Sequence, residues 1–315
     1  SGSDANDTHI KLLRYYHEAL NKTEKRKIIA RHRSYHGVTV AAASLTGLPV
    51  TQNHFDLPVD ALGILRTDHP HYYRGKEEGE SENQFVDRIV SNLENLIISE
   101  NPETIAAFIA EPITGASGVI VPPEGYYEKV QSVLSKYNIM FWADEVITGF
   151  GRTGSDFGCT TMNIHDPDLM TFAKQLSSAY MPISASAIRR DVYEAMIDQS
   201  AAAGAFGHGY TYSGHPVACA VALRVLEIYE RDNIFSRASA TGAYLQEKLK
   251  KFESHPLVGE VRGRGLLAAL ELVPNKELEH QFQDGRVGGV AQKMAQDNGL
   301  LIRTVAGSSI GICPP

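Results

Sequence analysis

The chain has 315 residues, 43% of them hydrophobic, and a formal net charge of −7, so it is long enough for one large domain or two. Its basic residues form no long run, which argues against nucleic acid as a partner, and no run of about 18 apolar residues predicts a membrane span. The opening SGSDANDTHI lacks the features of a signal peptide, and three separated cysteines predict reduced thiols in a cytoplasmic protein.

The first part of the chain alternates between helical and strand patterns. Asp7 or Thr8 is a candidate N-cap for a helix that runs to about Leu20. The further elements expected in chain order are a strand at 27–32, a short helix at 38–45, and amphipathic helices at 84–98 and 125–138.

Continuous apolar strands follow, and three of them end in a charged residue. The expected strands are 106–113, 139–146, 168–175 and 183–188. Such strands alternating with helices predict an α/β fold with a mainly parallel sheet covered on both faces. Ligands bind outside the carboxyl ends of strands in these sheets, and Glu111, Asp144 and Lys174 each lie at such an end. We therefore expect the three side chains to share a site.

The pattern changes after residue 214. The segments expected there are helices at 216–231 and 236–252, one strand-like stretch at 261–273, a helix at 288–297 and a strand at 300–305. We predict a large domain over 1–214, with its N-terminal part missing, and a linker helix with part of a smaller α+β domain over 215–315. Both ends look abrupt, so we expect the chain to be a piece of a longer polypeptide.

Lys174 and Asp144 each allow a chemical and a structural explanation. A buried lysine loses solvation, which lowers its pKa, and a neutral amine can form a Schiff base with an aldehyde; alternatively Lys174 reaches the surface or pairs with an acid. A buried Asp144 needs a partner. That partner could be the protonated ring nitrogen of pyridoxal phosphate (PLP), or Arg152 in a salt bridge.

Three further segments are compatible with the same cofactor. The stretch SGS (1–3) precedes a helix and could bind a phosphate, or be an ordinary capped turn. Tyr35 lies two residues before a glycine and could lay its ring on a flat cofactor, or simply pack in a loop. In GYTYSGHP, Thr211 could contact a second anion, or Ser213 could cap the following helix.

Together these segments carry a family resemblance. The motifs SGSDANDT, YHG, EPITGASG, ADEVITGFGRTG, AKQLSS and GYTYSGHP occur in the order seen in class III aminotransferases. The chain resembles their amine– and ω-amino-acid–pyruvate branch from residue 1 to residue 315, with Asp4 where a glutamate is more usual. The resemblance implies PLP-dependent transferase fold type I, with residues 1–214 as the PLP-binding domain, and a homodimer with shared active sites.

The resemblance also implies roles for individual residues. Lys174 would hold PLP through a Schiff base, and Asp144 would pair with its ring nitrogen. The residues that would contact PLP are Gly2, Ser3, Tyr35, Glu111, Asp144, Val146, Lys174 and, reaching the phosphate in the neighbouring subunit, Thr211. Arg303 matches a mobile arginine that pairs with substrate carboxylates, and Tyr35 would also touch the substrate. No metal is expected.

The activity expected from the resemblance is ping-pong transamination. An amine or ω-amino acid would give its amino group to the cofactor, and a keto acid, pyruvate above all, would accept it. Alternatives within the fold are an aminomutase and a decarboxylating transaminase. Alternatives outside it are a cofactor-free Schiff-base lyase and a non-catalytic binding protein. The identity of the donor does not follow from the sequence.

Overall fold

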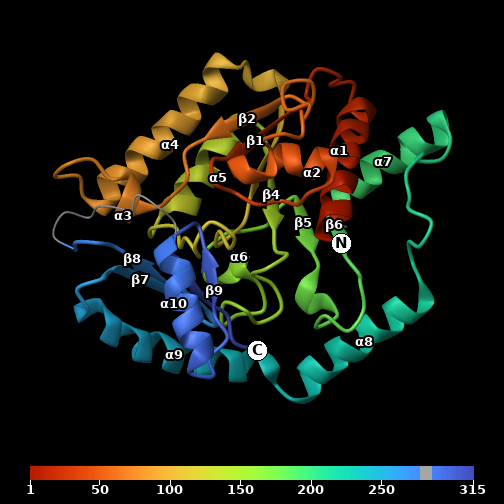
Figure 1. Cartoon of the computed structure of the whole chain (residues 1–315). Coiled ribbons are helices and arrows are strands. Elements are labelled where there is room, and N and C mark those ends of the chain that lie inside the picture. The colour runs from red at the N-terminus through yellow and green to blue at the C-terminus, as the bar shows by residue number, and fades with distance from the viewer. Residues whose placement is uncertain (277–285) are drawn as a thin grey trace.

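A central sheet of six strands forms the core of the computed structural model, which describes residues 1–276 and 286–315 (Figure 1). The strand order is β2-β1-β3-β4-β5-β6; all neighbours are parallel except β6, which runs antiparallel to β5. The strands are β1 (Lys27–Arg31), β2 (Ile64–Thr67), β3 (Ile105–Ala110), β4 (Met140–Asp144), β5 (Leu169–Phe172) and β6 (Ala185–Ile188). The predicted α/β fold with a mainly parallel sheet is confirmed.

Helices cover both faces of this sheet, as expected for continuous apolar strands. On one face pack α1 (Gly2–Ala19), α2 (Val40–Leu45) and α7 (Arg190–Ala203); on the other lie α4 (Glu82–Ser99) and α5 (Tyr126–Lys136). Successive side chains of a strand point to opposite faces, so Trp142 of β4 is buried toward α1 and Phe141 toward α4 and α5.

A second, antiparallel sheet gathers at the lower left of Figure 1 and has the order β7-β8-β10-β9. Its strands are β7 (Val258–Arg264), β8 (Leu267–Leu272), β9 (Arg303–Val305) and β10 (Ser309–Ile312), and α9 (Ile234–Leu249) and α10 (Arg286–Asp297) pack against it. The long helix α8 (Pro216–Arg231) runs along the bottom of the view toward it. The boundary proposed after residue 214 falls just before α8 and stays a prediction.

Short helical turns complete the chain. They are η1 (Pro49–Thr51), α3 (Tyr72–Gly75), η2 (Pro102–Thr104), α6 (Gly158–Thr161), η3 (Lys174–Leu176) and η4 (Lys250–Ser254). Among the residues that the structure describes, no helix is both long and apolar enough to cross a membrane.

A buried arginine links the small sheet to the loop that follows β3 of the central sheet. Arg262 of β7 donates from Nε to the Gly118 carbonyl at 2.8 Å, and its guanidinium pairs with Glu260 and Glu271. Nearby, Val119 packs in one apolar cluster with Leu267 of β8. These contacts hold β9 and β10 beside the carboxyl ends of the central strands.

Two predicted elements differ from the structure. The first helix begins at Gly2, not at Asp7 or Thr8, because the Asp7 carboxylate accepts a hydrogen bond from Thr39 and the Thr8 hydroxyl donates to a carbonyl of its own helix. The single strand expected at 261–273 is a hairpin. Gly265, at φ +55°, makes the turn, and it lies so close to the Thr153 backbone that a Cβ would be 2.3 Å from its carbonyl carbon.

Candidate active site

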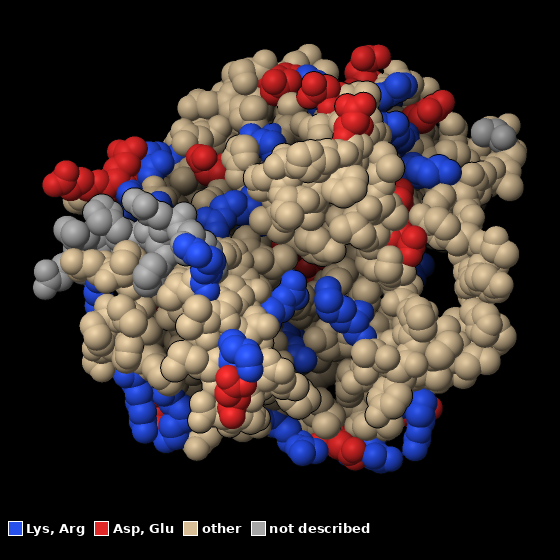
Figure 2. All heavy atoms as spheres, in the orientation of Figure 1, with Lys and Arg blue, Asp and Glu red and all other residues tan. Residues whose placement is uncertain are grey.

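A cavity of about 1020 Å³ opens at the carboxyl ends of the central strands, bordered by the start of α1 and by β9 and β10. The corresponding face in Figure 2 is hollowed near its centre, and basic side chains lie around the hollow. Of the predicted site residues, those that line this cavity are Gly2, Ser3, Tyr35, Glu111, Asp144, Val146, Lys174 and Arg303. Glu111, Asp144 and Lys174 thus line one cavity, as their places at the strand ends predict.

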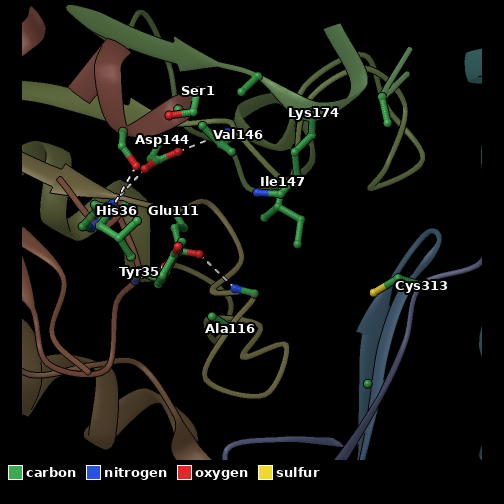
Figure 3. Close-up of a pocket in the computed structure, with 18 of the residues that line it drawn as sticks. Ser1, Tyr35, His36, Glu111, Ala116, Asp144, Val146, Ile147, Lys174 and Cys313 are labelled. Atoms are coloured by element: carbon green, nitrogen blue, oxygen red, sulfur yellow. Dashed lines mark hydrogen bonds and ion pairs between the residues drawn. The ribbon is translucent and has the colours of Figure 1, made fainter. Parts of the chain in front are cut away.

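Asp144 is a buried carboxylate, 2% exposed, at the end of β4. Its Oδ1 accepts from the Val146 amide at 3.1 Å, and its Oδ2 accepts from His36 Nδ1 at 2.8 Å (Figure 3). The same Oδ2 also accepts from Asn6 Nδ2 at 3.1 Å. Burial alone would raise the pKa of Asp144, but hydrogen bonds from His36 and Asn6 and the charge on His36 bring the pKa below its ordinary value. The site therefore holds an anion facing the cavity.

The partners of Asp144 differ from the salt bridge considered as an alternative. Arg152 donates to the Pro314 carbonyl and faces the side chain of Gln175, so the suggested Asp144–Arg152 pair is wrong. Sequence reasoning missed the actual partners, Asn6 and His36. The available signal was that both residues lie inside motifs already singled out, and that a buried carboxylate requires donors.

Glu111 orders the loop that carries Tyr35. It is 3% exposed and follows β3 directly; its Oε1 accepts from the Tyr35 amide at 2.9 Å and its Oε2 from the Gly115 amide at 3.0 Å. Burial raises the pKa of Glu111, and the nearby Asp144 charge adds to this against the opposing effect of His36. Glu111 thus ties together two loops at the rim of the cavity and sets the position of Tyr35.

Lys174 follows β5 in a conformation that lysine rarely adopts. Its φ of +42° lies in the left-handed region, and its side chain is exposed in the cavity, on another side from Tyr35 (Figure 3). Left-handed backbone in a non-glycine residue costs of order 1–3 kcal/mol and concentrates at functional sites. The expectation of a desolvated amine at the end of a buried strand is wrong for this chain, because the strand ends at Phe172 and Lys174 faces the open cavity.

The first turn of α1 faces the same cavity. Backbone amides at a helix N-terminus attract anions, and here they belong to Gly2 and Ser3. Gly2 allows close packing on Val146, since a Cβ at Gly2 would lie 2.9 Å from a Val146 methyl. The Ser3 hydroxyl accepts from the Val38 amide at 3.1 Å, which leaves its hydrogen free to donate into the cavity.

The opposite wall comes from the small sheet. It consists mainly of apolar side chains: Leu301, Ile302 and Val305, with Val119 from the loop after β3 and Ile147 from the loop after β4. Arg303 of β9 is the cation of this wall, and no aspartate or glutamate of residues 1–276 and 286–315 forms a salt bridge with it. The wall therefore presents one guanidinium beside apolar surface.

Thr211 does not join the other residues. It is exposed and lies outside the cavity of its own chain, and its assignment to a neighbouring subunit stays a prediction. Ser213 does not cap α8: its hydroxyl accepts from the Tyr210 amide at 3.1 Å, and the N-cap is His215 without a side-chain bond.

The residues present fit PLP. Asp144 is an ionised acceptor for a ring N–H, a helix N-terminus with a serine hydroxyl suits a phosphate, and Tyr35 and Val146 can enclose a flat ring. Lys174 supplies an amine on the same cavity.

The chain matches known proteins along its whole length. The family model for aminotransferase class-III matches residues 1–315. Gamma aminobutyrate transaminase 1, mitochondrial, and transaminase 3, chloroplastic, both of Solanum lycopersicum, are 51% and 50% identical to the whole chain, which covers 61% and 60% of their lengths. The chain thus spans about 60% of the length of these relatives.

Solved structures give the same result. The omega transaminase from Pseudomonas jessenii in complex with PMP has a TM-score of 0.97 and 51% identity; the alignment covers this whole chain and 69% of that one. A structure described as a transaminase with L-ala has a TM-score of 0.97 and 50% identity, and covers this whole chain and 74% of that chain. The chain therefore belongs to the class III aminotransferases, a family that uses PLP.

Proposed function

We propose that the protein is a PLP-dependent aminotransferase that moves an amino group from an amine or ω-amino acid to a keto acid, with pyruvate as the acceptor. The observation that carries the proposal is that Asp144, the last residue of β4, and Lys174, just after the neighbouring strand β5, line one cavity. The names of relatives 50% identical or more, transaminases for γ-aminobutyrate and omega transaminases, support the same class of substrate.

In this proposal each side chain has a defined task in holding the cofactor. Asp144 would accept the hydrogen bond of the protonated ring nitrogen, while Tyr35 and Val146 would lie against the two ring faces. The start of α1 and Ser3 would bind the phosphate. When bound, PLP supplies an electron sink that makes the proton on the amine-bearing carbon of the substrate removable.

Lys174 would move that proton. Its amine can take a proton from the substrate carbon and deliver it on the same side of the cavity, acting as base and then as acid. The strained φ of +42° fixes where the side chain leaves the backbone, which favours one direction of approach. The apolar wall of the small sheet would keep water from competing for the proton.

Arg303 would select substrates that carry a carboxylate. Replacing it by glutamine should raise KM for an ω-amino acid donor by about 10- to 100-fold, since a charge-assisted hydrogen bond is lost. The KM for an amine without a carboxylate should change little. Donor half-reactions measured without keto acid test this, with Arg264→Gln as the control because Arg264 lies on β7 outside the cavity. Equal effects on both donors would contradict the role.

Gly37 should be essential for the phosphate end of the site. Its φ is +126°, and a Cβ there would lie 2.4 Å from the Ser3 hydroxyl and 2.9 Å from the Ala42 Cβ. Gly37→Ala should therefore displace Ser3 and weaken binding of pyridoxamine phosphate (PMP) by about tenfold or more, as expected for a lost hydrogen bond to a charged group. Equilibrium dialysis measures this. Gly79→Ala is the control, also at positive φ but with open space around it; unchanged affinity in Gly37→Ala would contradict the assignment.

The proposed activity can be tested by its half-reactions. A donor alone should convert the PLP-loaded protein to the PMP form, seen by absorbance, and pyruvate alone should restore it with formation of alanine. Failure of either step in the full-length protein would overturn the proposal. An aminomutase would regenerate its starting spectrum without pyruvate, and a decarboxylating enzyme would release CO₂; neither is favoured by the relatives.

Two finer statements belong to the same proposal. We infer a homodimer in which Thr211 reaches the phosphate of the partner, supported by its exposed position outside its own cavity. Sedimentation of the full-length protein and PMP affinity of Thr211→Ala test it. A cytoplasmic location stays a prediction, because the relatives' names include both mitochondrial and chloroplastic proteins.

A further inference from the structure

We propose that Trp142, Thr171 and Asn6 form a one-way hydrogen-bond relay that positions Asp144 for the cofactor ring nitrogen. The inference deepens the proposed function and rests on it. It assigns positioning roles to three residues on two strands and one helix, none of which lines the cavity.

The relay is continuous and fully buried. Trp142 Nε1 donates to Thr171 Oγ1 at 2.8 Å, and Thr171 Oγ1 donates to Asn6 Oδ1 at 2.7 Å. Asn6 Nδ2 then donates to Asp144 Oδ2 at 3.1 Å and to the His36 carbonyl at 2.6 Å. Trp142, Thr171 and Asn6 are each 0% exposed.

The pairing register of β4 and β5 brings the side chains of the relay together. Thr171 pairs with Asp144 across β4 and β5, and Trp142, two residues before Asp144, points to the same face of the sheet. Helix α1 covers that face and brings Asn6 over the strand ends. The arrangement thus follows from the sheet and the helix that also carries the phosphate site.

The direction of the relay is set at both ends. An indole N–H can only donate, so Thr171 must accept from Trp142 and use its own hydrogen for Asn6. The Asn6 oxygen is thereby occupied, and its NH₂ group must face Asp144. Rotating the amide by half a turn would put its oxygen against the carboxylate and the His36 carbonyl, two acceptors at 3.1 and 2.6 Å.

A ring contact holds the far end of the relay in place. His9 packs edge-on against Trp142, with ring centroids 5.1 Å apart, and its Nε2 lies 3.0 Å from the Met170 carbonyl. Bonds in a chain of this kind polarise one another in a dry interior. A substitution at Thr171 should therefore alter the hydrogen bonding of Asp144, although Thr171 itself does not line the cavity.

The test measures binding of PMP to the full-length protein freed of cofactor. Thr171→Val keeps the shape and the strand preference but removes the hydroxyl, and we expect PMP to bind about tenfold more weakly. Thr171→Ser keeps the hydroxyl and should bind within about twofold of the wild type. A packing role would give the opposite order, since valine fills the site better than serine. Trp142→Phe, which removes only the indole donor, should weaken PMP in the same direction as Thr171→Val.

A second ligand separates positioning of Asp144 from general damage. For an analogue of PMP with a carbon atom in place of the ring nitrogen, wild type and Thr171→Val should bind equally. Thr153→Val is the matched control: Thr153 is 5% exposed and bonds the Thr161 hydroxyl at 2.8 Å, apart from the relay. It should bind both ligands like the wild type.

Three outcomes would overturn the relay: equal PMP affinity in Thr171→Val and Thr171→Ser, equal losses for PMP and the analogue, or an equal loss in Thr153→Val. If one of these outcomes is found and the wild type still binds PMP and transaminates, the relay is wrong but the proposed function is not affected. A wild type that does not bind PMP would overturn the proposed function, and the relay with it.

Discussion

Lys174→Ala is expected to lower turnover by at least about 10⁴-fold while PLP and PMP still bind, because the amine that moves the proton is lost and the phosphate and ring contacts remain. Lysine and alanine both carry a Cβ, so the substitution does not relieve the backbone strain at φ +42° and should not change the fold. Steady-state kinetics and equilibrium dialysis of the full-length protein measure the two effects.

A surface lysine gives the control for this change. Lys129→Ala removes a salt bridge between α5 and Asp87 of α4, neither of which lines the cavity, and should keep turnover within about twofold. Turnover of Lys174→Ala within tenfold of the wild type would contradict the assignment of Lys174 as the proton carrier.

Asp144→Asn should lower turnover by about 10²–10³-fold, the range for loss of one preorganised electrostatic group, and should weaken PMP binding. Asparagine is nearly the same size, but it is neutral and turns an NH₂ toward donors from His36, Asn6 or Val146. The buried site would then lack the negative charge that keeps a ring nitrogen protonated. kcat of the PLP-saturated protein and PMP affinity report the change.

The neighbouring Glu145 provides a matched control for Asp144. Glu145 is equally buried but points away from the cavity, where it accepts from the amides of Gly158 and Cys159 at 3.0 and 2.7 Å. Glu145→Gln should keep turnover within a few-fold of wild type. An equal loss in both variants would show that any neutral residue at this strand end disturbs the site, and would contradict the specific role of Asp144.

The pH dependence of Asp144 follows from its lowered pKa. Folding lowers the pKa of the Asp144 carboxyl below its ordinary value of 3.8. The ionised carboxylate therefore stabilises the native state at pH values above 3.8, and this stabilisation is lost as the pH falls through the lowered pKa. Asp144→Asn should remove that part of the acid sensitivity. Unfolding monitored between neutral and acid pH would show a smaller change in the variant.

Much of the site could be predicted because strand ends are readable in the sequence. Continuous apolar runs fixed the expected positions of Glu111, Asp144 and Lys174, and the parallel sheet placed them at one edge. Expected helices and strands agree with the structure to within a few residues for most elements, for example at β1 and α8. The roles of individual residues, Lys174 and Asp144 included, came from the family resemblance and stay predictions.

What could not be predicted depends on contacts between distant segments. Asn6 and His36 meet Asp144 from 138 and 108 residues away, and nothing in the local pattern shows which donors a buried carboxylate receives. Lys174 is exposed because it lies beyond the end of β5 and lines the open cavity, which the apolar pattern of the strand does not show. The hairpin at Gly265 was missed because strand-like residues lie on both sides of it; its φ of +55° and its packing against Thr153, both of which favour glycine, show only in the structure.

Transfer of nitrogen from donor to acceptor tests the central claim most directly. Full-length protein loaded with PLP would be incubated with a ¹⁵N-labelled ω-amino acid, γ-aminobutyrate first, and unlabelled pyruvate. The account predicts ¹⁵N-alanine in amounts equal to the carbonyl product of the donor, and none with Lys174→Ala. Absence of labelled alanine across a panel of ω-amino acids and amines, or equal labelling by Lys174→Ala, would contradict it.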